Sequence, residues 1–318
     1  MNGRLLIGGG LFTNEQLSFG ELVTENPLFR VSNVRSVSYG TSDEPIDEEF
    51  VVVFGMKGMV RTLSKNDLGW RKTRIKIETF FRETIPPKVP LIIVDDFSLE
   101  QARYLQKSLL KFFSNEFSLK LYLLREYLRG KTYPNTVQPF SLPADSYSKF
   151  RVNRVDKIVD IFFHGNASSA DRLEITAKLK KKYPQANNHL VVTYGGVKNT
   201  SDRLSRDDFL NLMARSNFCL NFSGSGYDCY RYHEIASVGS VIVSPDYPHV
   251  IRNDYKDMVS CLKYRNFRDL TNKLERLRGS DALLEDMVRY SIDNFERYHT
   301  SEIRASEFMN FVVDAVRN

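Results

Sequence analysis

The sequence contains little cysteine and no long hydrophobic run. Its three cysteines, Cys219, Cys229 and Cys261, form no ligand-spaced cluster, which excludes a small disulfide scaffold and suits a reducing cytosol. The apolar runs, such as residues 51–54 and 91–94, fall far below the ~20 residues that span a bilayer. No positively charged stretch precedes an apolar one at the N-terminus, so we predict no signal peptide and a cytoplasmic location.

The sequence also lacks a strong excess of charge in either half. Its 45 Lys and Arg residues against 39 Asp and Glu residues give a net charge of +6. Residues 1–150 carry 20 basic and 17 acidic side chains, and residues 151–318 carry 25 and 22. An evenly spread excess is weak evidence for a nucleic-acid-binding face, although it would not repel an anionic substrate. Composition fits a globular protein and leaves its function open.

Short β-rich apolar runs alternate with segments of helical period along the chain. Strands are predicted at residues 4–7, 50–54, 91–94, 119–124, 158–163, 190–193, 218–222 and 240–244. This alternation predicts α/β units with mostly parallel strands. Between residues 131 and 150 no helical or strand pattern continues, because this stretch contains Pro134, Pro139 and Pro143. We therefore predict two Rossmann-like domains, residues 1–150 and 151–318, with final helices that can return to the first domain and a ligand-binding cleft between the two.

The most informative stretch is residues 216–243. A buried strand leads through a Gly/Ser loop into a helix that begins near Tyr230 and would end at Gly239. Free backbone N–H groups and the positive end of the helix dipole meet at such a junction, which makes a diphosphate site. Arg231 could pair with phosphate oxygens there, and Glu234 could accept hydrogen bonds from sugar or ribose hydroxyls. On spacing alone, a solvated ion pair three residues apart is the competing interpretation.

The same stretch resembles the donor-binding motif of GT-B glycosyltransferases, especially exostosin-like and bacterial surface-polysaccharide enzymes. The residues that match in order are Phe218, Cys219, Leu220, Gly224, Gly226, Asp228, Tyr230, Arg231, Glu234, Ala236 and Gly239. Cys229 replaces the usual serine, and Pro245 stands later than the family's proline. The resemblance implies a GT-B fold, two Rossmann-like domains facing across a cleft, and a nucleotide-sugar donor, with a UDP-sugar as the first expectation. The donor contacts it implies in this stretch are Ser223, Gly224, Gly226, Tyr227, Asp228, Tyr230, Arg231, Tyr232 and Glu234.

A second segment, residues 163–172, is similar to the first strand, loop and helix of the same nucleotide-binding domain. In such a domain Gly165 and Asn166 would let the donor approach the backbone, and Arg172 would help to hold phosphate. Tyr194 and Gly195, at the end of a later strand, would face the base. A capped turn with a solvated arginine is the alternative, because every α/β unit needs such a turn.

Candidates for the acceptor side lie in the first half. Residues 121–143 resemble a pattern of bacterial polysaccharide transferases that would put Arg125 and Glu126 at the cleft edge; an ion pair at a strand end explains both equally well. An inverting transfer needs a base for the acceptor hydroxyl, and Asp95, Asp96 and Glu126 are the candidates. Capping of the next helix is the alternative for the two aspartates. A retaining transfer needs no such base, and the sequence leaves the stereochemistry open.

No Asp-x-Asp motif stands at a strand end, so we expect no metal site. Arg231 and the helix dipole would then neutralise the leaving group, with Arg172 as a further candidate. The sharpest basic cluster consists of Arg71, Lys72, Arg74 and Lys76. It could contact an anionic acceptor such as DNA, a phosphorylated lipid or an acidic glycan, or it could simply be a solvated face.

These features predict a metal-independent glycosyltransferase. It would move a sugar from a nucleotide sugar to an acceptor hydroxyl on a glycan or lipid-linked glycan, as in polysaccharide biosynthesis, with peripheral membrane contact left open. One alternative is a phage-type DNA glycosyltransferase that acts on a hydroxylated base. A second is a nucleotide-binding module without enzymatic activity.

Overall fold

The computed structural model describes residues 3–7, 35–38, 50–54, 69–95, 105–141, 144–167, 169–193, 204–224 and 226–317. The chain divides into two compact units. The first comprises Met1–Ser141, His249–Arg252 and Glu302–Asn318, and the second comprises Leu142–Pro248 and Asn253–Ser301. The first passage between them, at residues 141 and 142, lies within the stretch 131–150 that contains the three prolines.

The first unit is built on a parallel sheet. Its strands are β1 (Gly3–Ile7), β2 (Arg35–Ser38), β3 (Phe50–Phe54), β4 (Pro90–Asp95), β5 (Ser118–Leu124) and β6 (Val137–Pro139). Their order is β2-β1-β3-β4-β5-β6, and every described pairing is parallel. This is a doubly wound order. The four predicted strands are confirmed; β2 and β6 were not predicted, because both are short and carry little apolar periodicity.

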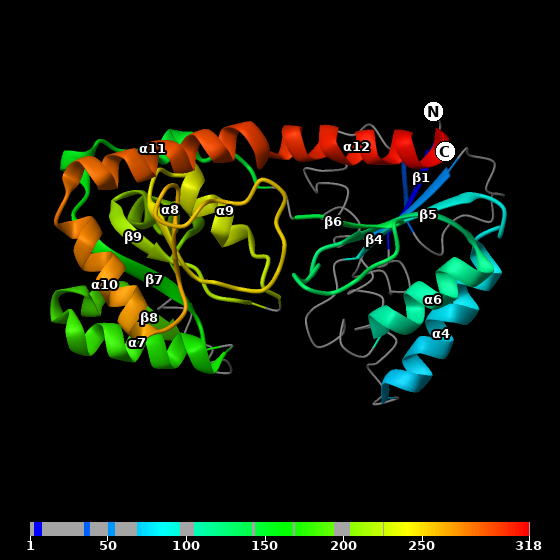
Figure 1. Cartoon of the computed structure of the whole chain (residues 1–318), viewed down its shortest axis with the longest axis horizontal. Coiled ribbons are helices and arrows are strands. Elements are labelled where there is room, and N and C mark those ends of the chain that lie inside the picture. Colours follow the sequence, from blue (N-terminus) through cyan, green and yellow to red (C-terminus); the bar gives the residue numbers. More distant parts are fainter. Residues whose placement is uncertain are drawn as a thin grey trace. The chain divides into compact units, whose positions relative to one another are not determined.

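Helices cover both faces of this sheet (Figure 1). They are α4 (Gly69–Thr84), α6 (Lys107–Glu116) and α12 (Ser301–Arg317). Ile77 of α4 and Phe113 of α6 pack with Val51 on one face, whereas Phe308 of α12 packs with Val52 on the other. The side chains of consecutive residues in β3 thus pack into the cores on opposite faces of the sheet, because side chains alternate along a strand. Within α6, Leu109, Phe112 and Phe113 recur at helical spacing and form its buried side.

The second unit repeats the plan of the first. Its strands are β7 (Val159–Asn166), β8 (Leu190–Thr193), β9 (Ser216–Leu220), β10 (Val241–Pro245) and β11 (Leu262–Tyr264). Their order is β11-β10-β9-β7-β8, again with every described pairing parallel. The chain leaves β7 and β9 toward opposite edges of the sheet, so a crevice opens at their carboxyl ends, where doubly wound folds bind ligands. The four predicted strands are confirmed, and β11 was not predicted.

Helices also cover both faces of the second sheet. They are α7 (Ala170–Lys182), α8 (Arg206–Ala214), α9 (Tyr230–Ser237), α10 (Phe267–Arg278) and α11 (Asp281–Tyr298), with 3₁₀ helices at Ser148–Phe150, Arg154–Asp156 and Pro184–His189. Phe163 packs with Leu179 of α7 and Leu274 of α10, whereas Phe162 contacts Phe209 of α8. Helices α7 and α10 lie on one side of the sheet and α8 on the other (Figure 1). Helix α8 is capped by Ser205, whose hydroxyl accepts a hydrogen bond from the backbone N–H of Asp208 at 3.1 Å.

A half-buried lysine ties the ends of α8 and α9 to the sheet. Nζ of Lys157, which precedes β7, donates to the carbonyl oxygens of Ala214, Ser216 and Gly239 at 2.8, 2.9 and 2.8 Å. Ala214 closes α8, and Gly239, with φ +79°, follows α9. The ammonium therefore meets the partial negative charge at two helix ends. Its burial lowers the pKa of Lys157 to about 8.

We expect Lys157→Met to lower the free energy of unfolding by about 2–4 kcal/mol at pH 7, because three carbonyls lose their donor. The folded-state pKa of about 8 lies below the ordinary value of 10.5. The unfolded chain therefore keeps the lysine proton to higher pH, and the wild-type protein should gain stability over the variant between pH 8 and 10.5. Denaturant titrations across this range measure both effects. Lys181→Met, at an exposed position of α7, is the neutral control; equal stability of all three proteins at pH 7 would contradict the assignment.

Candidate functional site

The crevice of the second unit is bordered by the end of β7 and by the loop that joins β9 to α9. The Ser223 N–H in this loop donates to the Tyr247 hydroxyl at 2.7 Å, and the Gly224 N–H donates to the carbonyl of Gly226 at 3.0 Å. The loop then enters α9 at Tyr230. The predicted sequence of strand, glycine loop and helix is therefore confirmed, and its junction lies at the point where the strand order reverses.

Arg172 bridges the two loops of the crevice. Its Nη1 donates to the carbonyl of Asn166 after β7 at 2.8 Å, and its Nη2 donates to the carbonyl of Ser223 after β9 at 2.9 Å. The side chain is buried, and burial lowers the pKa of the guanidinium. Two backbone carbonyls thus fix a positive charge at the centre of the crevice. The alternative of a solvated helix residue does not describe Arg172.

Arg231 lies near Arg172 and contacts two aromatic rings. Its guanidinium carbon is 5.2 Å from the centroid of the Phe163 ring and 5.1 Å from that of Phe209. The Arg231 side chain is half-buried, and it donates no hydrogen bond to any residue that the structure describes. Burial is the main cause that lowers the pKa of Arg231; the negative charge of Glu234 opposes this shift, and the positive charge of Arg172 adds to it.

Gly165 allows Arg231 to lie against β7. A Cβ atom at this position would stand 3.0 Å from Cζ of Phe163 and 3.2 Å from Nη1 of Arg231. Both distances are shorter than ordinary carbon contacts, so a side chain at position 165 would displace one of the two groups. Position 165 thus needs a glycine because Arg231 and Phe163 lie close to its backbone, and not because the backbone is left-handed.

Glu234, one turn after Arg231, forms an ion pair that was not predicted. Its Oε1 lies 2.6 Å from Nη2 of Arg206, the first residue of α8. The guanidinium of Arg206 in turn lies 4.9 Å from the Tyr147 ring centroid. Nothing in the spacing of the sequence singled out Arg206, because α8 and α9 are brought together only by tertiary packing.

Three arginines therefore alternate with aromatic rings in this part of the second unit. Arg172 and Arg231 share the ring of Phe163, and Arg231 and Arg206 share the ring of Phe209. Only Glu234 supplies a carboxylate in contact with one of the three arginines, among the residues that the structure describes. A site with this excess of positive charge can bind a multiply charged anion such as a diphosphate.

The other residues predicted to bind the donor have different environments. Tyr230 is largely exposed, and the Tyr227 ring lies 4.8 Å from that of Tyr247. Asp228 is buried, with Oδ1 at 3.9 Å from Nε2 of His233. Tyr232 lies in the core, where its hydroxyl donates to Asp254, so it does not join the arginine cluster. Tyr194 and Gly195 lie outside the described residues.

The candidates of the first unit lie mostly at the carboxyl ends of β4 and β5. The Asp95 carboxylate is buried, and its Oδ2 accepts hydrogen bonds from Tyr122 at 2.7 Å and from Gln106 at 3.1 Å. Arg125 and Glu126 are also buried, with Nε and Oε1 separated by 3.6 Å. Asp96 lies outside the described residues.

The predicted basic cluster lies on α4. Arg71 and Lys72 are exposed, and Arg74 is half-buried with its Nε at 3.1 Å from Glu78. Thr73 of the same helix turns inward and is fully buried. The cluster therefore belongs to the outward-facing side of an amphipathic helix.

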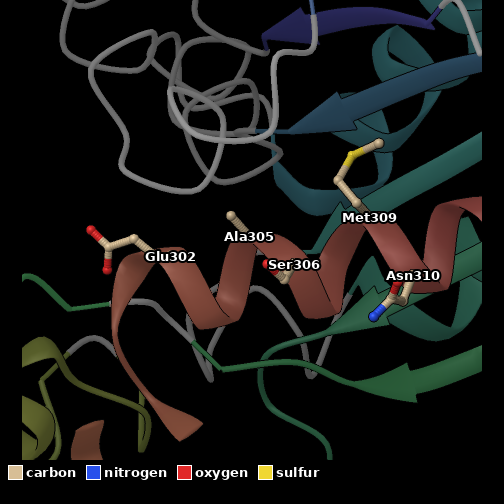
Figure 2. Close-up of a pocket in the computed structure, with 5 residues that line it drawn as sticks. All are labelled: Glu302, Ala305, Ser306, Met309 and Asn310. Atoms are coloured by element: carbon tan, nitrogen blue, oxygen red, sulfur yellow. The ribbon is translucent and has the colours of Figure 1, made fainter. Parts of the chain in front are cut away.

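A separate hollow of about 450 Å³ lies along α12 in the first unit (Figure 2). The residues that line it are Glu302, Ala305, Ser306, Met309 and Asn310. They recur at intervals of three and four, so they form one face of a single helix. No residue from the site predictions is among them, and the crevice of the second unit remains the candidate site.

The described residues contain neither a cluster of metal ligands nor a helix suited to cross a membrane. No group of three or more His, Cys, Asp and Glu side chains among them could hold a metal ion. No helix in the described part of the chain has both the length and the apolar character that crossing a membrane requires.

Comparison with known proteins relates this architecture to glycosyltransferases. Residues 164–310, slightly under half of the chain, match the model of the glycosyl transferase-like family. HepE of Anabaena in complex with UDP superimposes with a TM-score of 0.58 and 10% identity, covering 99% of this chain and 100% of HepE. No curated protein matches the sequence.

Two further structures share this fold. An α-glucosyltransferase in complex with UDP and a 13-mer DNA containing a HMU base has a TM-score of 0.55 and 12% identity, with 100% of both chains covered. A trehalose-6-phosphate protein of E. coli bound with UDP-2-fluoro glucose has a TM-score of 0.54 and 10% identity, with 100% and 99% covered. The chain therefore has the GT-B fold of these structures, and residues 164–310 resemble the glycosyl transferase-like family. The family match contains α9, so Arg172, Arg206 and Arg231 all lie in the matched part of the chain.

Proposed function

We propose that the enzyme transfers a sugar from a UDP-sugar to an acceptor hydroxyl, with the diphosphate of the donor bound by Arg231 and Arg172. The observation that carries this proposal is the guanidinium of Arg231, which is half-buried between two rings and donates no hydrogen bond to any described residue. Desolvating a guanidinium without a partner is costly. A bound anion would supply the missing acceptors.

In this proposal the two arginines stabilise the departing nucleoside diphosphate. Negative charge grows on the diphosphate as its bond to the sugar breaks, and fixed donors in a desolvated crevice favour that change because they need no rearrangement. Arg172 is already held by two carbonyls, and α9 adds the positive end of its dipole. These groups would supply the positive charge that a metal ion provides in other transferases.

Glu234 is the proposed partner of a donor hydroxyl. Its Oε1 is held by Arg206, and its Oε2 accepts no hydrogen bond from the residues that the structure describes. A carboxylate oxygen is a strong acceptor for a ribose or sugar hydroxyl. Ser223, Gly224 and Gly226 would line the path of the donor along the loop.

The proposed acceptor is a glycan or lipid-linked glycan of polysaccharide biosynthesis, bound by the first unit of a cytoplasmic enzyme. For an inverting transfer, Asp95, Asp96 and Glu126 are the proposed bases. Asp95 already accepts two hydrogen bonds, so in that role it would have to exchange one of them for the acceptor hydroxyl.

A ligand screen tests the proposed donor. Thermal unfolding is measured with UDP-, GDP-, CMP- and dTDP-sugars at equal concentration. We expect selective stabilisation by UDP-sugars, because a ligand that binds only the folded state raises the melting temperature. Release of UDP from the stabilising donor, with or without acceptor, would then separate an enzyme from a binding module. No shift with any UDP-sugar would contradict the proposal.

DNA is the second candidate acceptor, favoured by the exposed residues Arg71 and Lys72 on α4 and by the fold shared with an α-glucosyltransferase bound to DNA. Duplex binding through these side chains should weaken steeply as salt increases, because phosphate contacts release counterions. Fluorescence anisotropy between 50 and 200 mM salt, roughly the range over which such binding falls by orders of magnitude, measures this slope. Negligible binding at low salt would exclude the DNA acceptor.

A further inference from the structure

The ion pair between Arg206 and Glu234 is asymmetric. Nη2 of Arg206 lies 2.6 Å from Oε1 of Glu234, and the arginine side chain is 49% exposed while the glutamate side chain is 12% exposed. The second carboxylate oxygen, Oε2, accepts no hydrogen bond from the part of the chain that the structure describes. The arginine therefore holds one oxygen of a nearly buried carboxylate and leaves the other available.

Arg206 is itself held from two sides. Its guanidinium carbon lies 4.9 Å from the centroid of the Tyr147 ring and 5.9 Å from that of Phe209. The segment of Tyr147 is fastened to α9, since the Tyr147 N–H donates to the Ser237 hydroxyl. Contacts to two rings and a carboxylate restrict the guanidinium to one orientation, which a flexible solvated arginine would not have.

The same cluster connects Arg206 to the proposed phosphate site. The Phe209 ring lies between Arg206 and Arg231, which is 5.1 Å from its centroid. A purely structural link between α8 and α9 would explain the ion pair but not the position of Arg206 beside the proposed phosphate site. A half-exposed ion pair also adds little to the stability of the fold. Fixing the carboxylate before the donor arrives, by contrast, reduces the ordering that binding would otherwise require.

We propose that Arg206 is a positioning residue of the donor site. It holds Glu234 through Oε1 and so directs Oε2 toward a hydroxyl of the donor, on the ribose or on the transferred sugar. This inference rests on the proposed function, because it needs a nucleotide-sugar donor in the crevice. It adds α8, a helix without a predicted donor residue, to the elements that determine donor recognition.

Hydroxyl deletion in the ligand tests the role of Arg206. Dissociation constants are measured by calorimetry for UDP-glucose, UDP and 2′,3′-dideoxy-UDP with the wild-type protein, Arg206→Met and Arg206→Lys. If Oε2 accepts from the ribose, the wild-type protein should prefer UDP over dideoxy-UDP by about 10-fold, and Arg206→Met should remove most of that preference. If Oε2 accepts from the sugar, the preference of UDP-glucose over UDP should fall instead. Arg206→Lys, which keeps the charge, should retain part of the discrimination.

A double-mutant cycle distinguishes positioning from direct contact. The variant with both Arg206→Met and Glu234→Gln should lose no more discrimination than Glu234→Gln alone, because Arg206 acts through Glu234. Arg289→Met, which removes an exposed ion pair with Asp286 on α11, is the matched control and should bind all ligands as the wild-type protein does.

The outcomes separate this inference from the proposed function. Unchanged ligand preferences in Arg206→Met, or equal weakening of all three ligands, would overturn the positioning role while leaving a UDP-sugar enzyme. Additive losses in the double variant would also overturn it, since Arg206 would then touch the donor itself. Failure of the wild-type protein to bind UDP and UDP-glucose would instead overturn the proposed donor and, with it, this inference.

Discussion

Replacing Arg231 by alanine should lower kcat/KM for sugar transfer by about 100-fold or more, because fixed donors to a developing charge commonly contribute at this level. The variant should fold as well as the wild-type protein, or better. Arg231 is half-buried near another guanidinium and donates no hydrogen bond to any described residue, so its removal relieves a cost in the empty protein. Steady-state kinetics and thermal unfolding measure the two effects.

Arg278 provides the matched control for Arg231. It too lies over an aromatic ring, 4.0 Å from the centroid of Tyr183, but its guanidinium is paired with Asp160 at 2.6 Å. Arg278→Ala should therefore lower the free energy of unfolding by about 1–2 kcal/mol and leave kcat/KM nearly unchanged. The opposite pattern, in which Arg231→Ala unfolds the protein and retains activity, would show that Arg231 is structural.

The opposite expectations for these two arginines follow from the contacts that each makes inside the chain. A side chain that the fold uses has its partners within the protein, and removing it costs stability. A side chain kept for a ligand lacks partners until the ligand arrives, so removing it costs function. The sequence shows only that both residues are arginines, and the structure separates the two cases.

Much of the fold could be predicted because its signals are local. The buried strands β3 and β4 contain continuous apolar runs, and the glycine loop before α9 is visible from a few adjacent residues. The short strand β11 was not predicted, because its three residues are too few to show an alternating pattern. Helix α10 was also not predicted, although Asn266 caps it and Leu270 and Leu274 mark its buried side.

Only those site residues that belong to one continuous segment of sequence could be predicted. Arg231 and Glu234 follow from one strand, loop and helix, and Arg172 from another. The pairing of Glu234 with Arg206 joins residues 28 positions apart on different helices, and the sharing of Phe209 by two arginines depends on how α8 packs against the sheet. Such contacts are set by tertiary packing, which a single sequence does not reveal.

Gly165→Ala tests whether the position of Arg231 matters as much as its charge. The added Cβ would stand 3.2 Å from Nη1 of Arg231 and 3.0 Å from the Phe163 ring, so the guanidinium or the ring must move by a few tenths of an ångström. Because charge-assisted hydrogen bonds depend on geometry, we expect the dissociation constant of UDP-glucose to rise about 10-fold or more, with all three arginines present.

Gly279→Ala is the control for this substitution, because its Cβ would meet only ordinary contacts of 3.4 and 3.6 Å after α10. Binding should be unchanged there. Near wild-type affinity in Gly165→Ala would mean that Arg231 has room to adjust and that its charge alone attracts the donor. If Gly165→Ala binds UDP-glucose weakly and keeps its melting temperature, the glycine of β7 determines where the guanidinium of Arg231 meets the phosphate. Adding Arg231→Ala to Gly165→Ala would then cause little further loss, because both changes remove the same contact.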